Sequence, residues 1–100
     1  MSDEKIVVEN VNIPGKTYLA NKAKYETMLQ AMRIALPYES PGLNQNEMFD
    51  AVLPHLPEEL FPGGKTAGYW VKTVQLDQEA KGNLIREKTK PLRWYWRETT

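Results

Sequence analysis

The stretch FPGGKTAGYW, residues 61–70, has the residue types of a phosphate-binding loop, because paired glycines precede a lysine and a hydroxyl side chain. A P-loop requires the spacing G-x-x-x-x-G-K-[ST], in which successive backbone N–H groups curl around the phosphates. Residues 64–66 supply the second half of that pattern, but Glu59 occupies the position of the first glycine and would repel phosphate. The glycines instead predict a break in the chain, and Thr66 is expected to be the N-cap of a helix that starts at Ala67.

Other side chains that do chemistry are few. The chain has no cysteine, which excludes disulfides and cysteine nucleophiles, and its single histidine, His55, excludes sites built from several histidines. Glu58 and Glu59 are adjacent and would diverge in most backbones, and Ser2 and Ser40 have no base nearby in the sequence. We therefore predict that the protein is not an enzyme and has no catalytic residues, metal, cofactor or small-molecule ligand. His55 is expected to be a partly exposed structural residue.

Length and composition fit a single small domain spanning residues 1–100, with 41% hydrophobic residues. The N-terminus, MSDEKIVVEN, is charged and lacks the apolar core of a signal peptide, and no apolar run reaches about 18 residues. The sequence therefore predicts a cytoplasmic protein without a membrane segment.

Charge is distributed unevenly along the chain. Residues 1–80 contain seven Lys and Arg against eleven Asp and Glu, a balance of −4, whereas residues 81–97 contain six against one, a balance of +5. A polyanion would therefore be met by the C-terminal segment.

A β-hairpin is expected at the N-terminus, over residues 5–20. β-Branched residues dominate residues 6–11, and a second short run follows at 17–20. The four residues between Ile13 and Lys16 place proline and glycine where a type II turn requires them.

Three helices are expected between that hairpin and the basic segment, within residues 21–81. The first is capped by Asn21 and runs to about Leu36. In the second, Asn44 and the glutamate three residues later form a capping box, and a proline should end the helix near Leu53. The third starts at Ala67 and ends at Gly82.

The third helix is apolar on two sides at 100° per residue. Trp70, Val71 and Val74 mark one side. The opposite side carries Tyr69, Thr73 and Leu76, and a narrow polar strip between them carries Lys72, Gln75 and Glu79. Such a helix is either wedged between neighbours or presents its second apolar side to a partner.

A second hairpin is expected over residues 83–97, with strands at 84–87 and 92–97 around a basic turn. Alternation in the second strand places Leu92, Trp94 and Trp96 on the face toward the core. The opposite face then carries Arg93, Tyr95 and Arg97.

The stretch TAGYWVKTVQLDQEAKGNLIREKTKPLRWYW resembles a winged helix-turn-helix domain, since a glycine joins its helix to a basic hairpin. The resemblance implies an α+β, winged-helix-like fold with three helices and a C-terminal β-hairpin wing, to which the N-terminal β-hairpin is an addition. It also implies that the third helix enters the major groove while the wing touches phosphate or the minor groove. Through LPEELFPGG, KTVQLD and PLRW, the whole chain resembles a small bacterial family of uncharacterised proteins, which brings no known activity.

Two functions are compatible with these patterns. The first is binding of DNA, through Lys72, Gln75, Arg86, Lys88, Lys90, Arg93, Tyr95 and Arg97. Against it, the candidate recognition helix carries Asp77 and Glu79 and has no arginine. The alternative is a module that binds another protein or a second copy of itself without nucleic acid, through Tyr69, Thr73 and Leu76.

The DNA hypothesis makes a demand on the structure. Trp94 and Trp96 must point inward, and the basic side chains of the wing must not be locked against acidic residues of the chain's own body. A solvated hairpin whose cations keep an exposed edge from pairing with other chains is the plainer interpretation of the wing.

Overall fold

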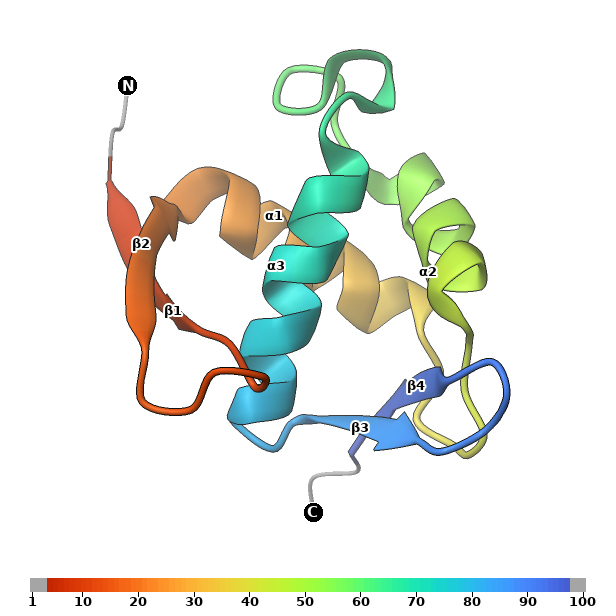
Figure 1. Cartoon of the computed structure of the whole chain (residues 1–100). Coiled ribbons are helices and arrows are strands. Elements are labelled where there is room, and N and C mark those ends of the chain that lie inside the picture. Colours follow the sequence, from red (N-terminus) through yellow and green to blue (C-terminus); the bar gives the residue numbers. More distant parts are fainter. Residues whose placement is uncertain (1–3, 98–100) are drawn as a thin grey trace.

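The computed structural model describes residues 4–97, which form three helices and two antiparallel hairpins (Figure 1). The N-terminal hairpin consists of β1 (Lys5–Glu9) and β2 (Thr17–Asn21), and the C-terminal hairpin of β3 (Leu84–Glu87) and β4 (Arg93–Trp96). The helices are α1 (Lys22–Ala35), α2 (Gln45–Val52) and α3 (Ala67–Ala80), with short 3₁₀ turns η1 (Leu53–His55) and η2 (Pro62–Gly64) between α2 and α3. The predicted α+β class, with three helices between two hairpins, is confirmed.

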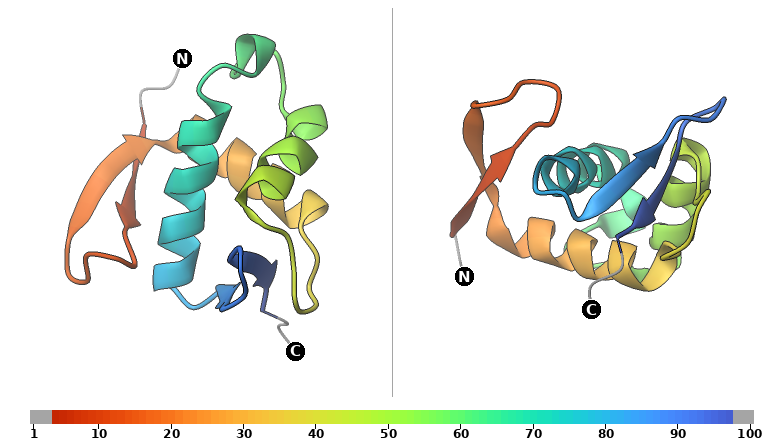
Figure 2. Two further views of the ribbon diagram at one scale, coloured as in Figure 1. Left: turned by 45° about the vertical axis from the view of Figure 1, so that its right-hand side comes forward. Right: turned by 90° about the horizontal axis from the view of Figure 1, so that it is seen from below.

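Helix α3 is the central element and contacts α1, α2, β1 and β3. In Figure 1 the N-terminal hairpin lies on one side of α3 and α2 on the other. Seen from below (Figure 2, right), α1 runs along one side of α3, and the turns of both hairpins extend past α3 on the opposite side. Two hairpins therefore flank the side of α3 that α1 does not cover.

The N-terminal hairpin has the predicted turn. The N–H of Lys16 donates to the carbonyl of Ile13 at 3.2 Å, and Gly15 has φ +88°. A positive φ at the third turn position is what a type II turn requires of glycine. The loop 10–16 that contains this turn joins the two strands in a register that places Val7 opposite Leu19.

The predicted caps of α1 and α2 are also present. The side chain of Asn21 accepts from Lys24 N–H at 3.0 Å. At α2, Glu47 N–H donates to Asn44 Oδ1 at 2.8 Å and Asn44 N–H donates to Glu47 Oε1 at 3.0 Å, which completes the capping box. Helix α2 ends at Val52, where Pro54 forces the chain into η1.

We expect Asn44→Ala to lower the free energy of unfolding by about 1 kcal/mol, because the N-cap acceptor for an orphan helix N–H is lost. Asn46→Ala is the matched control, since Asn46 is an exposed residue of the same first turn. Urea unfolding followed by circular dichroism measures both variants. Equal stability of the two would contradict the assignment of the cap.

Thr66 occupies the predicted N-cap position of α3, but its side chain does not cap the helix. The helix starts at Ala67 and Thr66 is its N-cap residue, but Thr66 has φ 60° and its hydroxyl donates to the carbonyl of Lys65 at 2.6 Å. A capping side chain accepts from the helix when its own backbone is extended. The left-handed backbone of Thr66 turns the hydroxyl back toward the preceding residue instead.

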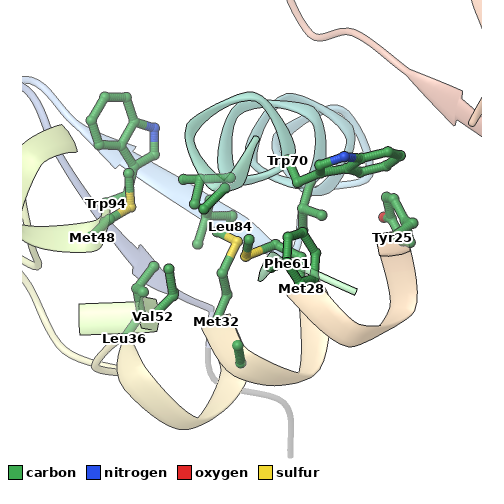
Figure 3. Packing of buried hydrophobic residues seen from close by; sticks show 14 of the residues in the cluster. Tyr25, Met28, Met32, Leu36, Met48, Val52, Phe61, Trp70, Leu84 and Trp94 are labelled. Atoms are coloured by element: carbon green, nitrogen blue, oxygen red, sulfur yellow. The ribbon is translucent and has the colours of Figure 1, made fainter. Parts of the chain in front are cut away.

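The core lies where the three helices meet the C-terminal hairpin (Figure 3). It is filled by Tyr25, Met28, Met32, Met48, Val52, Phe61, Trp70, Val71, Val74, Leu84, Trp94 and Trp96, all of which are buried. The prediction that both indoles of the second hairpin point inward is therefore confirmed. Leu92 was expected beside them but is 39% exposed, because it lies in the turn before β4 rather than in the strand.

Strand β4 is held on both of its edges. One edge pairs with β3. On the other, Leu43 and Trp94 exchange backbone hydrogen bonds of 2.9 and 2.8 Å, and Trp96 N–H donates to the Pro37 carbonyl at 2.9 Å. The segment between α1 and α2 therefore docks the C-terminal hairpin onto the helices.

Candidate interaction surface

Helix α3 is more enclosed than its sequence predicts. Thr73 is 3% exposed and Gln75 is 1% exposed, so neither side chain is available to an outside partner. The predicted polar strip is therefore wrong at Gln75, whereas the burial of Thr73 agrees with a helix wedged between its neighbours. Tyr69 is 61% exposed and Lys72 is exposed, while Leu76 is half-buried. What remains accessible is a narrow ridge along α3.

Asp77 is fully buried and collects donors from three elements. The N–H of Glu9 in β1 donates to it at 2.8 Å, the Tyr25 hydroxyl of α1 donates to it, and Lys81 Nζ lies 2.8 Å from both carboxylate oxygens. Gln78 Nε2 joins the cluster by donating to the Tyr25 oxygen at 2.8 Å. Burial and, next, the hydrogen bond to Asp77 raise the pKa of Tyr25, which keeps its phenol protonated.

Glu79 has the equivalent role toward the C-terminal hairpin. Its side chain is 5% exposed and accepts from Trp94 Nε1 at 2.9 Å, while Arg86 approaches it at 2.8 Å. Asp77 and Glu79, the two acidic residues of α3 that argued against nucleic-acid binding, thus hold parts of the fold together. Asp77 forms an ion pair with Lys81, and Glu79 forms one with Arg86. They leave little net negative charge on the exposed ridge.

The arginines of the C-terminal hairpin are largely engaged within the chain. Arg86 pairs with Glu79, and Arg93 Nη1 lies 3.1 Å from Glu47 Oε1. Arg93 also donates to the Gly42 carbonyl at 3.0 Å, and Arg97 donates to a backbone carbonyl. The condition that these cations stay clear of the chain's own acidic residues is therefore not met for Arg86 and Arg93, and these two arginines are withdrawn from the predicted DNA-binding residues.

The lysines at the tip of that hairpin differ from the arginines. Lys88 and Lys90 are exposed, and within residues 4–97 neither forms an ion pair. Tyr95, expected on the same outer face, is half-buried. The predicted basic cluster is thus divided: Arg86 and Arg93 form ion pairs, exposed Arg97 donates to the Gly82 carbonyl, and the lysines at the turn form no ion pair among the described residues.

One further lysine was not singled out by the sequence. Lys16 closes the turn of the N-terminal hairpin and is exposed. That turn and the turn of the C-terminal hairpin extend to the same side of α3 (Figure 2). We call this side the α3 face; it comprises the exposed ridge of α3 and the two turns, residues 10–16 and 88–92. Only the folded arrangement brings Lys16 to it.

Two hollows border the ridge of α3. A groove of about 310 Å³ lies between α2 and α3 and is lined by Gln45, Asn46, Phe49, Gly68, Val71 and Lys72. A second, of about 280 Å³, lies between the N-terminal turn and Ala80. Lys72 Nζ donates to Gln45 Oε1 at 3.3 Å at the edge of the first groove. The ridge is therefore raised between two depressions.

The remaining expectations concern chemistry and the membrane. His55 is exposed and lines a shallow hollow of about 520 Å³ against the outer side of α1. Within the described residues, no group of acidic and histidine side chains is placed to hold a metal ion. Over the same residues, no helix has both the length and the apolar character needed to span a bilayer.

The chain was compared with known proteins in three ways. Neither the curated proteins nor the solved structures gave a match. A family model described as a family of unknown function, DUF6958, matches residues 5–94 and so covers the helices and both hairpins as far as Trp94. On this match, the chain belongs to the DUF6958 family.

Proposed function

We propose that the protein binds nucleic acid through the α3 face. The observation that carries the proposal is the separation of charge. The lysines of this face, Lys16, Lys72, Lys88 and Lys90, are exposed and take part in none of the ion pairs among the described residues. The acidic residues of α3 are buried and opposed by Lys81 and Arg86. A polyanion approaching α3 would meet unpaired cations on the ridge and on both turns.

The interpretation as a winged-helix domain supports this proposal. Three helices are followed by an antiparallel hairpin, with Gly82 at the junction in the left-handed conformation. In such a domain α3 would lie toward a groove and the hairpin turns would contact phosphates on either side. Tyr69 and Lys72 are the side chains of α3 exposed enough to reach base edges or the backbone. Because the ridge is narrow, contacts to phosphate should dominate over reading of sequence.

Salt dependence is the expected signature of binding. Four lysines that each neutralise one phosphate of a duplex would give a slope of about −3.6 in log affinity against log salt. Affinity for random duplex DNA should then fall about a hundredfold between roughly 50 and 200 mM salt. Fluorescence anisotropy with labelled duplex and single-stranded DNA measures this dependence. Absence of salt-sensitive binding to either form would refute the proposal.

The residues involved are tested by a pair of double variants with equal change of charge. Lys88→Ala with Lys90→Ala should weaken binding and reduce the salt slope by about 2, since two phosphate contacts are lost. Lys22→Ala with Lys24→Ala removes two lysines from the start of α1, which runs along the opposite side of α3 (Figure 2), and should leave the slope unchanged, although it also removes the ion pair of Lys22 with Glu4. Equal effects of the two double variants on the salt slope would show that DNA is attracted by the overall charge of the protein and not by the α3 face.

The alternative is a module that binds protein through the ridge of α3. Tyr69 supports this alternative, because its side chain is 61% exposed. Its ring packs edge-on against that of Trp70, with 5.3 Å between the ring centroids. Nucleic-acid binding and protein binding are distinguished by measuring DNA binding of the unaltered protein and capture of a protein partner by Tyr69→Ala. If DNA binding is absent and Tyr69→Ala abolishes capture of a partner that the unaltered protein binds, the alternative is favoured.

A further inference from the structure

The N-terminal hairpin has one face turned to the core and one turned outward. Alternate residues of a strand point to opposite faces, and partners in register share a face. Val8 and Ala20, on the inner face, are buried against the helices. Val7 and Leu19 lie directly opposite each other on the outer face and are 54% and 64% exposed. The outer face therefore presents a cross-strand apolar pair to solvent.

Apolar exposure is concentrated on this hairpin. Of the eight large hydrophobic residues exposed within residues 4–97, four lie in it: Val7 and Leu19 on the outer face, Tyr18 opposite Val8, and Ile13 in the turn. Single exposed apolar residues are ordinary on a protein surface, but a cluster marks a site of interaction. A two-stranded sheet also gains stability when a further layer covers its open face.

The charges on the outer face indicate which layer would cover it. Lys5 and Glu9 are at opposite ends of β1, on the same face as Val7, and within the described residues neither forms an ion pair. Along β1 the outer face therefore carries a positive residue, Lys5, then apolar Val7, then a negative residue, Glu9. A two-fold axis perpendicular to β1 and passing at Val7 exchanges the two ends. Lys5 of each copy would then face Glu9 of the other.

We propose that the outer face of the N-terminal hairpin is the interface of a homodimer. Val7 and Leu19 of the two copies pack together at the centre, and two symmetric Lys5–Glu9 ion pairs flank them. A self-complementary patch of this kind is what a two-fold interface requires. The strand residues proposed for the dimer lie within β1 and β2 and are not among those of the α3 face, which comprises the ridge of α3 and the turns 10–16 and 88–92. The proposal therefore stands independently of nucleic-acid binding.

The interface differs from the one expected from sequence. Tyr69, Thr73 and Leu76 are the residues that the sequence predicts for contact with another protein or a second copy, and they lie on α3. The β-branched residues of 6–11 predict a strand there, but they do not show that Lys5 and Glu9 flank Val7 on one face of it. The register with β2, which adds Leu19 to the same face, comes from the folded hairpin.

Oligomeric state provides the first test. Sedimentation velocity and light scattering should show a concentration-dependent dimer for the unaltered full chain. Leu19→Glu should raise the dimer dissociation constant by about tenfold or more, since it buries a charge at the centre of the apolar pair. Ile34→Glu is the matched control, because Ile34 is 62% exposed on α1, outside the hairpin, and should leave dimerisation unchanged. A chain that is monomeric at every concentration overturns the proposal, as does an equal effect of the two variants.

Charge reversal tests the geometry of the interface. Lys5→Glu and Glu9→Lys, each alone, place like charges opposite one another and should each weaken the dimer. The double variant, Lys5→Glu with Glu9→Lys, restores opposite charges in a two-fold arrangement and should recover dimerisation. Thermal unfolding confirms that each variant folds, and if Leu19→Glu does not fold, the charge series decides the question. Failure of the double variant to recover the dimer would refute the two-fold pairing.

Discussion

Asp77→Ala is expected to lower the free energy of unfolding by about 3–5 kcal/mol, because a buried cluster of donors loses its common acceptor. Glu9 N–H and the Tyr25 hydroxyl would each be left in the interior without the carboxylate that they now contact. Lys81 adds less to the loss, since its side chain is 37% exposed and water can solvate the ammonium group. The cluster joins β1, α1 and α3, so its loss should loosen the N-terminal hairpin first.

Asp50→Ala provides the matched control for this loss. Asp50 is an exposed aspartate on α2, and its replacement should change stability by less than about 0.5 kcal/mol. Thermal unfolding should separate the two variants clearly, because about 1 kcal/mol shifts the midpoint of a 100-residue domain by roughly 4–8 °C. Similar midpoints for the two variants would mean that the buried carboxylate does not hold the elements together.

Gly42→Ala should destabilise the docking of the C-terminal hairpin by about 3 kcal/mol or more, through backbone strain and lost hydrogen bonds. Gly42 has φ +88°, and a Cβ at this position would overlap the carbonyl oxygen of Trp94 and come within 3.1 Å of Tyr95 Cβ. Relief of that overlap must move the 37–43 segment away from β4. The two backbone hydrogen bonds between Leu43 and Trp94 would be lost with it.

Gly15→Ala separates the cost of backbone strain at a positive φ from the cost of the overlap with β4. Gly15 has the same φ, +88°, but within residues 4–97 no atom beyond Gly15 and its two chain neighbours lies within 4 Å of the position its Cβ would take. Its replacement should therefore cost only the conformational strain, about 1–2 kcal/mol. The excess loss at Gly42 then measures the close approach to β4. Urea unfolding gives both stabilities, and near-ultraviolet circular dichroism reports on the packing of the indoles of Trp94 and Trp96. Equal losses for the two variants would contradict the docking role of Gly42.

Features that depend on neighbouring residues could be predicted from the sequence. The capping box of Asn44, the type II turn ending at Lys16 and the end of α2 before Pro54 each follow from groups within four residues of one another. The inward orientation of Trp94 and Trp96 follows from strict alternation in a strand. The caps and the turn were predicted correctly because the interactions that decide them form locally. Alternation placed the two indoles on one face of the strand, and packing against the helices buries that face.

Two other predictions, the capping role of Thr66 and the start of the last strand, were wrong. Thr66 is at the N-cap position of α3, but its left-handed backbone keeps the hydroxyl from capping the helix. Leu92 falls outside β4, because the turn is one residue longer than alternation predicted. Both errors lie at element boundaries, where the backbone conformation is chosen by the loop as much as by the helix or strand.

For the candidate interaction surface, sequence supplied the charges and tertiary structure decided which of them are free. The excess of cations in residues 81–97 is a property of composition alone. Whether Arg93 is available depends on Glu47, 46 residues away, and whether Gln75 is accessible depends on what packs against α3. Periodicity places residues on one side of a helix but does not say which neighbour covers that side. Lys16 and Lys88 come to one face only because both hairpins fold past α3, an arrangement set by long-range packing.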